Sequence, residues 1–299
     1  MVKIVPNQYS LFIADALDIA VKGDVSIGAE NFFSLSKKPR FEPIVHQLPK
    51  GKITITPTSG NALATVYDES ILLFLISQLV HGADKGEPLG KTIYFSGFDY
   101  FHFIQKHKIG GKDYEEIWKA LERLKTTYVE LEMNGIEGSD AKFNWLSFIQ
   151  KDWITNKKGQ KQAVGFHVEV PNRLVKAVED RRVLTLDRRY FKMRSPVERW
   201  IYRFVRKSVG RAINENFKYW SWEKLHKKSA STDTLTMFKK TTRAILKRSD
   251  YRLFQYTVEE AQRGNEKGLY FDLSPYAVLD QGRPLMIDGT RNSTTKSNE

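Results

Sequence analysis

The sequence predicts an α+β protein built from two similar units, and three observations lead to this fold class. The chain has 299 residues, which suits two domains better than one because single hydrophobic cores stop growing near ~250–300 residues. Hydrophobic residues make up 41% of the chain, enough to bury real cores and to exclude disorder over most of its length. One order of periodic segments, namely helix, short helix, helix and then two strands, occurs twice.

The first copy begins at Asp68, a candidate N-cap for an apolar helix that stops at Gly82. A brief strand and a short helix starting near Ser96 follow, and Gly110-Gly111 forms a turn. Strands are expected over 128–133, 142–153 and 162–170, with a hairpin turn at 156–159. The third helix, over 112–127, should have one apolar face made of Ile117, Ala120, Leu121 and Leu124.

The second copy begins at Ser195-Pro196, a good N-cap and first-turn proline for a helix that ends at Gly210. A short helix lies within 217–230, and a third helix runs from Thr234 to Arg248. Strands over 251–260 and 267–274 are joined by a polar, glycine-containing, basic loop. The inner face of the third helix should be Leu235, Phe238, Thr242 and Ile245.

This order of elements is typical of a winged helix, a variant of the helix-turn-helix. The sequence therefore predicts two tandem winged-helix domains with β-hairpin wings. The expected boundaries are 1–168 for the N-terminal domain and 169–287 for the C-terminal one, with a disordered tail over 288–299. Residues 41–68 should add two or three strands beside the first domain.

The net charge of +13 is concentrated in one part of the chain. Residues 181–250 contain 20 Lys and Arg against 6 Asp and Glu, a net of +14, whereas the other 229 residues contain 28 against 29, a net of −1. A face that binds a polyanion would be concentrated in this way. The alternative is a basic surface that has no partner.

The third helix of the second copy is the candidate for the major groove of double-stranded DNA. Arg243 is the candidate for a bidentate contact with a guanine, because the planar guanidinium fits the O6 and N7 acceptors. The outward side of the helix should carry Thr236, Lys239, Lys240, Arg243 and Lys247. The alternative is an ordinary solvated basic face.

Further DNA contacts are expected on both sides of this helix. Lys227 and Lys228 are phosphate candidates at the end of the short helix. Ser229, Ser231 and Thr232 offer hydroxyl groups for a phosphate, although capping of the helix is an equally good use of them. Arg263 and Lys267 flank the tip of the wing and would reach a neighbouring backbone or minor groove.

The third helix of the first copy differs in charge, since it has four carboxylates (Asp113, Glu115, Glu116 and Glu122) among its basic residues. It should contact DNA by a narrow edge or serve protein–protein contact. Tyr114 and Trp118 would suit an interface if they are exposed, and core packing is the alternative.

Enzyme signatures are missing from the sequence, so neither catalysis nor a cofactor is expected. The six histidines form no zinc motif, there is no cysteine and there is no GxxxxGK[ST] phosphate loop. The longest apolar stretch, over 71–80, is far shorter than the ~20 residues of a membrane-spanning helix. The N-terminus lacks the features of a secretory signal, so we expect a soluble cytoplasmic protein.

Four segments resemble the replication initiator protein A (RepA-like) family of bacterial plasmids: LFIADALDIAVKGD, ENFFSLSKKPR, ITITPTSGNALATVYDESILLFLISQL and VLTLDRRYFKMRSPVERWIYRFVRKSVG. The resemblance covers roughly residues 10–275. It implies a tandem winged-helix initiator that binds direct repeats (iterons) in a plasmid origin, helps melt an adjacent AT-rich segment and recruits the host initiator and replicative helicase. It also implies a monomer–dimer equilibrium in which dimers repress the protein's own gene or pair origins.

Two other functions compete with this hypothesis. A winged-helix transcriptional regulator without a replication role would share the fold, and fold alone does not separate the two. A nicking enzyme would need a tyrosine near a metal-binding histidine cluster, and the sequence shows none.

Overall fold

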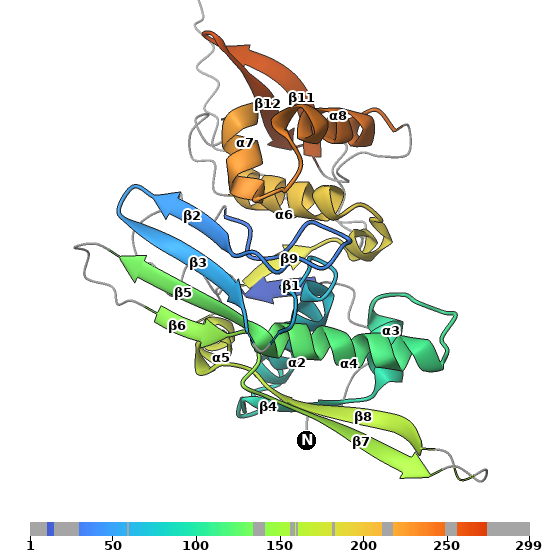
Figure 1. The fold of residues 1–299 in the computed structure, drawn as a ribbon. Helices are drawn as coiled ribbons and strands as arrows, with labels where there is room; N and C mark the ends of the chain where they lie inside the picture. The colour runs from blue at the N-terminus through green and yellow to red at the C-terminus, as the bar shows by residue number, and fades with distance from the viewer. Residues whose placement is uncertain are drawn as a thin grey trace, which may run out of the picture.

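The structure, a computed structural model, describes residues 11–14, 30–58, 60–133, 141–155, 159, 161–180, 183–210, 218–248 and 256–273. Within these ranges it is a mixed α/β protein with antiparallel sheets (Figure 1). We call residues 30–180 the first unit and residues 195–273 the second unit. Figure 1 shows the elements from α6 onward gathered at one end of the molecule and the β7–β8 hairpin at the other.

The first unit contains the predicted order of helices and a three-stranded sheet in the order β4-β8-β7. Its elements are α2 (Glu69–Asp84), β4 (Thr92–Phe95), α3 (Gly97–Phe103), α4 (Gly111–Thr126), β7 (Phe148–Thr155) and β8 (Lys161–Glu169). The predicted start of α3 is confirmed, because Ser96 forms a capping box with Asp99. All four residues of the predicted apolar face of α4 are buried. The helix α2 continues two residues beyond Gly82, where the sequence predicted its end.

A second sheet of the first unit has the order β2-β3-β5-β6. Its strands are β2 (Ile44–Leu48), β3 (Gly51–Pro57), β5 (Thr127–Met133) and β6 (Ala141–Asn144). The single strand predicted over 142–153 is wrong, since β6 and β7 belong to different sheets. Between β6 and β7, the consecutive residues Trp145 and Leu146 are both buried. Consecutive side chains of one strand point to opposite faces of the sheet, so burial of both is unusual for a strand with one exposed face. The chain therefore leaves one sheet at this point and enters the other.

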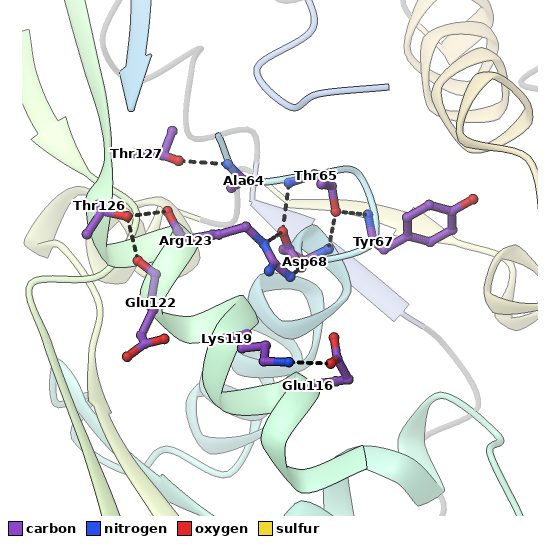
Figure 2. A network of polar contacts seen from close by, with 10 residues as sticks. All are labelled: Ala64, Thr65, Tyr67, Asp68, Glu116, Lys119, Glu122, Arg123, Thr126 and Thr127. Carbon is purple, nitrogen blue, oxygen red and sulfur yellow. Dashed lines mark hydrogen bonds and ion pairs between the residues drawn. The ribbon is translucent and has the colours of Figure 1, made fainter. Parts of the chain in front are cut away.

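Asp68 occupies the predicted N-cap position of α2, but its side chain makes no capping hydrogen bond. Its carboxylate instead accepts hydrogen bonds from Arg123 of α4, at 2.8 Å from Nε and 2.7 Å from Nη2, and from the Thr65 backbone N–H at 2.7 Å (Figure 2). The Ala64 N–H donates to Thr127 Oγ1 at 2.8 Å beside this network. Asp68 is 4% exposed, so this bidentate pair fixes the end of α4 against the start of α2.

The second unit repeats the order of the first, with a sheet in the order β10-β12-β11. Its elements are α6 (Pro196–Gly210), β10 (Tyr219–Ser221), α7 (Trp222–Ser229), α8 (Leu235–Leu246), β11 (Tyr256–Arg263) and β12 (Glu266–Leu273). The predicted inner face of α8 is confirmed: Phe238, Thr242 and Ile245 are buried, and Leu235 packs against the same core.

The hairpin of the second unit is longer than the sequence predicted. Most of the expected loop is strand, because Arg263 of β11 pairs with Glu266 of β12 and only Gly264 and Asn265 form the turn. Gly264 has φ +58°, which a two-residue hairpin turn requires. The polar residues of this segment lie on a hairpin that projects from the core, so their polarity does not indicate a loop.

The helix α5 (Asn172–Glu179) is the last element of the first unit and contacts α2. Between the units, β9 (Val183–Leu186) pairs with β1 (Leu11–Ala14), which contacts α2, and β9 itself contacts α6. The predicted boundary after residue 168 therefore falls just before the end of β8, and the packing of the first unit extends through α5. The predicted tail over 288–299 lies outside the described residues.

A buried polar contact joins the two units at the starts of α2 and α6. Glu69 forms an ion pair with Arg203, and Arg199 Nη1 donates to Ser70 Oγ at 2.9 Å. Burial raises the pKa of the Glu69 carboxyl, and the charge of Arg203 opposes this effect. In the part of the chain that the structure describes, no helix is both long and apolar enough to cross a bilayer.

Candidate nucleic-acid interface

The helix α8 has one buried and one exposed face, and half of the exposed residues of the helix and its C-cap are basic. Thr234 is the N-cap of α8, and its Oγ1 accepts a hydrogen bond from the Met237 N–H at 3.3 Å. Phe238, Thr242 and Ile245 anchor the opposite side in the core. The exposed residues of α8 and of its C-cap include Thr236, Met237, Lys240, Arg243 and Lys247. The predicted stripe of four residues thus lies in solvent, with Met237 beside it.

Arg243 links α8 to the β11–β12 hairpin. Its guanidinium forms an ion pair with Glu260 of β11, in which Nη2 lies 3.5 Å from Oε2, and it lies 5.5 Å from the centre of the Trp222 ring. Both partners of the ion pair are about half exposed, and exposed pairs contribute only ~0–1 kcal/mol. A guanine would have to replace Glu260 as the acceptor for Arg243. Because the ion pair is exposed, breaking it costs little free energy.

Lys239 is directed toward α7. Its ammonium lies 3.2 Å from the Glu223 carboxylate, and the side chain is only a quarter exposed. Among the five predicted outward residues of α8, Lys239 is therefore the least accessible, whereas the other four are exposed.

The end of α7 places the three predicted residues at 227–229 in different surroundings. Lys227 is exposed. Lys228 pairs with Glu30 of the first unit, and its ammonium lies 5.2 Å from the centre of the Trp220 ring. Ser229 is fully buried, and its hydroxyl donates to the His226 carbonyl at 2.7 Å. Of these three side chains, only that of Lys227 is presented to solvent for a phosphate.

The hydroxyl groups in and next to the turn between α7 and α8 have different surroundings. Ser231 accepts a hydrogen bond at 3.2 Å from the Asp233 N–H, so its side chain stabilises the turn. Thr234, which was not among the candidates, caps α8. Thr232 is exposed and is available to a ligand.

The β11–β12 hairpin presents Arg263 and Lys267 near its turn. Arg263 is opposite Glu266, and Lys267 is opposite Gln262 in the adjacent pair. Both basic residues are exposed, so the two-residue turn holds them at the same end of a regular hairpin.

A buried charged cluster lies behind the α7–α8 turn, between the two units. Glu30 accepts from His46 Nδ1 at 3.0 Å and pairs with Lys228, while His46 Nε2 lies 2.8 Å from the Asn31 carbonyl. Burial alone would raise the pKa of the Glu30 carboxyl. The hydrogen bond from His46 and the charge of Lys228 outweigh burial and hold this pKa below its usual value of 4.5.

In the first unit, Tyr114 and Trp118 are partly buried and pack against the core, and Tyr114 also lines a hollow. Tyr114 packs on Gly97, where an added Cβ would lie 2.4 Å from its ring. Phe98 and Trp153, at 61% and 50% exposure, are the exposed aromatic residues that line this hollow of about 500 Å³ beside α4. The sequence carries no signal for Trp153, because its exposure follows a register shift between Asp152 and Trp153 in β7.

Among the described residues, no group of three or more acidic or histidine side chains comes together in a way that would hold a metal ion.

Comparisons with known proteins bear on the fold and on the family. The family described as Replication initiator protein A matches residues 22–258. A protein of Wigglesworthia glossinidia brevipalpis named "Putative replication protein" is 33% identical over 202 residues, which cover 66% of this chain and 70% of that protein. A crystal structure of RctB domains 2–3 has a TM-score of 0.55 at 13% identity and covers 80% of this chain and 93% of that one. A selenomethionine form of the same domains has a TM-score of 0.57 at 12% identity and covers 86% and 98%.

Proposed function

The chain belongs to the replication initiator protein A family, and from this premise we propose that it initiates plasmid replication by binding direct repeats in the origin as double-stranded DNA. The single observation that carries the DNA-binding part is the exposed basic stripe of α8 beside the wing. It lies within residues 181–250, whose net charge of +14 accounts for the positive charge of the whole chain.

We propose that each unit is a winged helix, with α4 and α8 as the third helices and the β7–β8 and β11–β12 hairpins as wings. The support is that the two sheets have the same strand order, β4-β8-β7 and β10-β12-β11, behind the same succession of helices. In a winged helix, the third helix can enter the major groove while the wing reaches the adjacent backbone.

In this arrangement α8 would read base edges and its neighbours would bind phosphates. Arg243 would exchange Glu260 for the O6 and N7 atoms of a guanine, and Thr236 would contact a different base. Lys227, Lys240 and Lys247 would neutralise phosphates, which fix the register but carry no sequence information. Arg263 and Lys267 would bind the backbone or minor groove beside the site.

The first unit would act through a different surface. Its α4 is rich in carboxylates, which disfavours a broad phosphate contact, and exposed aromatic residues border the hollow beside it. We propose that this unit makes narrow DNA contacts in the monomer and subunit contacts in a dimer that represses the protein's own gene. Melting of an AT-rich segment and recruitment of the host initiator and replicative helicase would follow in the cytoplasm, without catalysis by this chain.

Binding to duplexes that tile the DNA around the coding gene tests the proposal. We expect tight binding to tandem direct repeats beside an AT-rich stretch. If six to ten phosphates are neutralised, affinity should fall roughly 10³–10⁵-fold between about 50 and about 200 mM salt. A salt dependence near zero would contradict DNA binding, and binding only to an inverted repeat at the gene's promoter would favour a transcriptional regulator.

A further inference from the structure

The C-terminal end of α7 is capped by residues of the first unit. The Asn31 N–H donates to the Lys228 carbonyl at 3.1 Å, and Asn31 Nδ2 donates to the Ser229 carbonyl at 2.8 Å. Arg40 Nη1 donates to the Ala230 carbonyl at 2.8 Å. The last carbonyls of a helix have no partner within the helix. Three successive carbonyls at the end of α7 are thus satisfied from another part of the chain.

Hydrogen bonds within the first unit hold the side chains of both donors, Asn31 and Arg40, in place. Asn31 is 1% exposed, and its Oδ1 accepts from the Phe33 N–H at 3.3 Å. The Arg40 guanidinium also donates to the carbonyls of Glu42 and Pro43, both at 3.2 Å. Contacts within the first unit therefore orient the donor groups of these two side chains toward α7.

The backbone at Ala230 needs such support. Ala230 has φ +50° and ψ +30°, in the left-handed region. Glycine or asparagine usually occupies this position after a helix, because a side chain with a Cβ costs roughly 1–2 kcal/mol there. The hydrogen bond from Arg40 falls on the carbonyl of this strained residue.

The strained residue leads directly into the turn that positions α8. The Ser231 N–H donates to Ser229 Oγ at 3.1 Å, and His226 Nε2 lies 2.7 Å from the Asp233 carbonyl. Thr234 then caps α8. The path from the capped end of α7 to the first turn of α8 is therefore a short series of local hydrogen bonds, and its starting point is fixed by the first unit.

We propose that Asn31 and Arg40 are positioning residues for DNA binding, which set the geometry of the α7–α8 turn and thereby the orientation of α8. The proposal rests on the proposed function of α8. It implies that the second unit reaches its full affinity only while the first unit is docked on α7, so the contact couples the arrangement of the two units to DNA binding.

Hydrogen exchange of the full chain without DNA tests the structural half of the proposal. In Arg40→Ala, the amides over 227–236 should exchange faster than in the wild type. The control is Lys37→Ala, which removes one exposed positive charge from the same segment and should leave these amides unchanged. Thermal unfolding of each variant shows that it is folded.

DNA binding by the same variants tests the functional half. Arg40→Ala should lower the affinity for the origin duplex by roughly tenfold, as expected for the loss of a charge-assisted hydrogen bond to a partly buried carbonyl, and by more than Lys37→Ala does. Adding Ala230→Gly to Arg40→Ala should restore part of both the affinity and the exchange protection, because glycine adopts the left-handed conformation without strain.

The outcomes separate this proposal from the proposed function. Unchanged exchange over 227–236 in Arg40→Ala would overturn the positioning role, and so would an affinity loss no larger than that of Lys37→Ala. A wild-type chain that binds no origin duplex would overturn the proposed function instead, whatever the exchange data show.

Discussion

Arg243 lies in the middle of the exposed stripe of α8 and is paired with Glu260. Replacing it with alanine should weaken binding to the cognate repeat by about 1–3 kcal/mol and relax the preference at one base position, since a bidentate guanine contact is lost. Competition with duplexes changed one base pair at a time measures both effects. Lys227→Ala is the control, and it should weaken binding to all sequences alike.

A change at Glu260, the ion-pair partner of Arg243, should have the opposite effect on DNA binding. The change Glu260→Gln removes a carboxylate that lies beside the proposed DNA surface and competes for the Arg243 guanidinium. We expect the variant to bind duplex DNA more tightly, and stability should change by less than ~1 kcal/mol because the pair is exposed. Weaker binding by this variant would show that the ion pair orients Arg243 for the DNA.

Glu30 should make the contact between the units sensitive to acid. Its pKa in the folded protein is below the usual 4.5, so its stabilising effect is present above that value and is lost as the pH falls through the folded pKa. Unfolding by denaturant at about pH 7 should show Glu30→Gln less stable than the wild type by ~1–3 kcal/mol, and at about pH 3 the difference should be smaller. A difference that does not depend on pH would contradict the ionised state of Glu30.

At the scale of elements, β12 depends on a glycine where it passes β10. Gly268 is opposite Ser221, and an added Cβ would lie 2.1 Å from the Trp220 carbonyl oxygen. Because the atom in the way belongs to the backbone, Gly268→Ala should separate β10 from β12 and destabilise the protein by at least ~1–3 kcal/mol. Thermal unfolding measures the loss. The variant keeps Gly264 of the same hairpin, because the positive φ of that residue favours glycine for a different reason.

The elements that the sequence predicts well are those with local signals. The inner faces of α4 and α8 follow from spacings of three and four residues, and the start of α3 follows from Ser96 and Asp99. The break between β6 and β7 depends on which sheet each strand joins, and no local pattern specifies that. The two-residue turn at Gly264 was missed because an exposed hairpin has a polar sequence.

In the candidate site, too, local sequence patterns predict some residues correctly, whereas contacts between distant segments are not predicted. Thr236, Lys240 and Lys247 were placed on the exposed side of α8 by helical periodicity alone. Lys228 and Ser229 are predicted to contact phosphates, but Lys228 pairs with Glu30 and Ser229 is buried, next to residues some two hundred positions earlier in the chain. Contacts between distant segments leave no periodic trace in the sequence.

At the scale of the whole molecule, two units with the same succession of elements carry very different charge. Residues 181–250 hold the entire positive excess, and the units are joined by buried polar contacts at Glu69 and Arg203 and at the end of α7. This asymmetry suits a division in which the second unit binds DNA and the first supports it and contacts partners.

The salt dependence of binding should follow the charge of α8 in particular. Each phosphate contact contributes roughly −0.9 to the slope of log affinity against log salt. Replacing Lys240 and Lys247 with alanine should therefore reduce the slope by about 2. The matched control replaces Lys85 and Lys125, two exposed lysines of the first unit, and removes the same charge.

The most direct test is the affinity of these two double variants for the origin duplex, measured by fluorescence anisotropy over a range of salt concentrations. The account predicts that Lys240→Ala with Lys247→Ala weakens binding strongly and flattens the salt dependence, while Lys85→Ala with Lys125→Ala changes both much less. Equal losses in the two variants would mean that binding follows total charge, and would contradict the assignment of α8 as the DNA-binding surface.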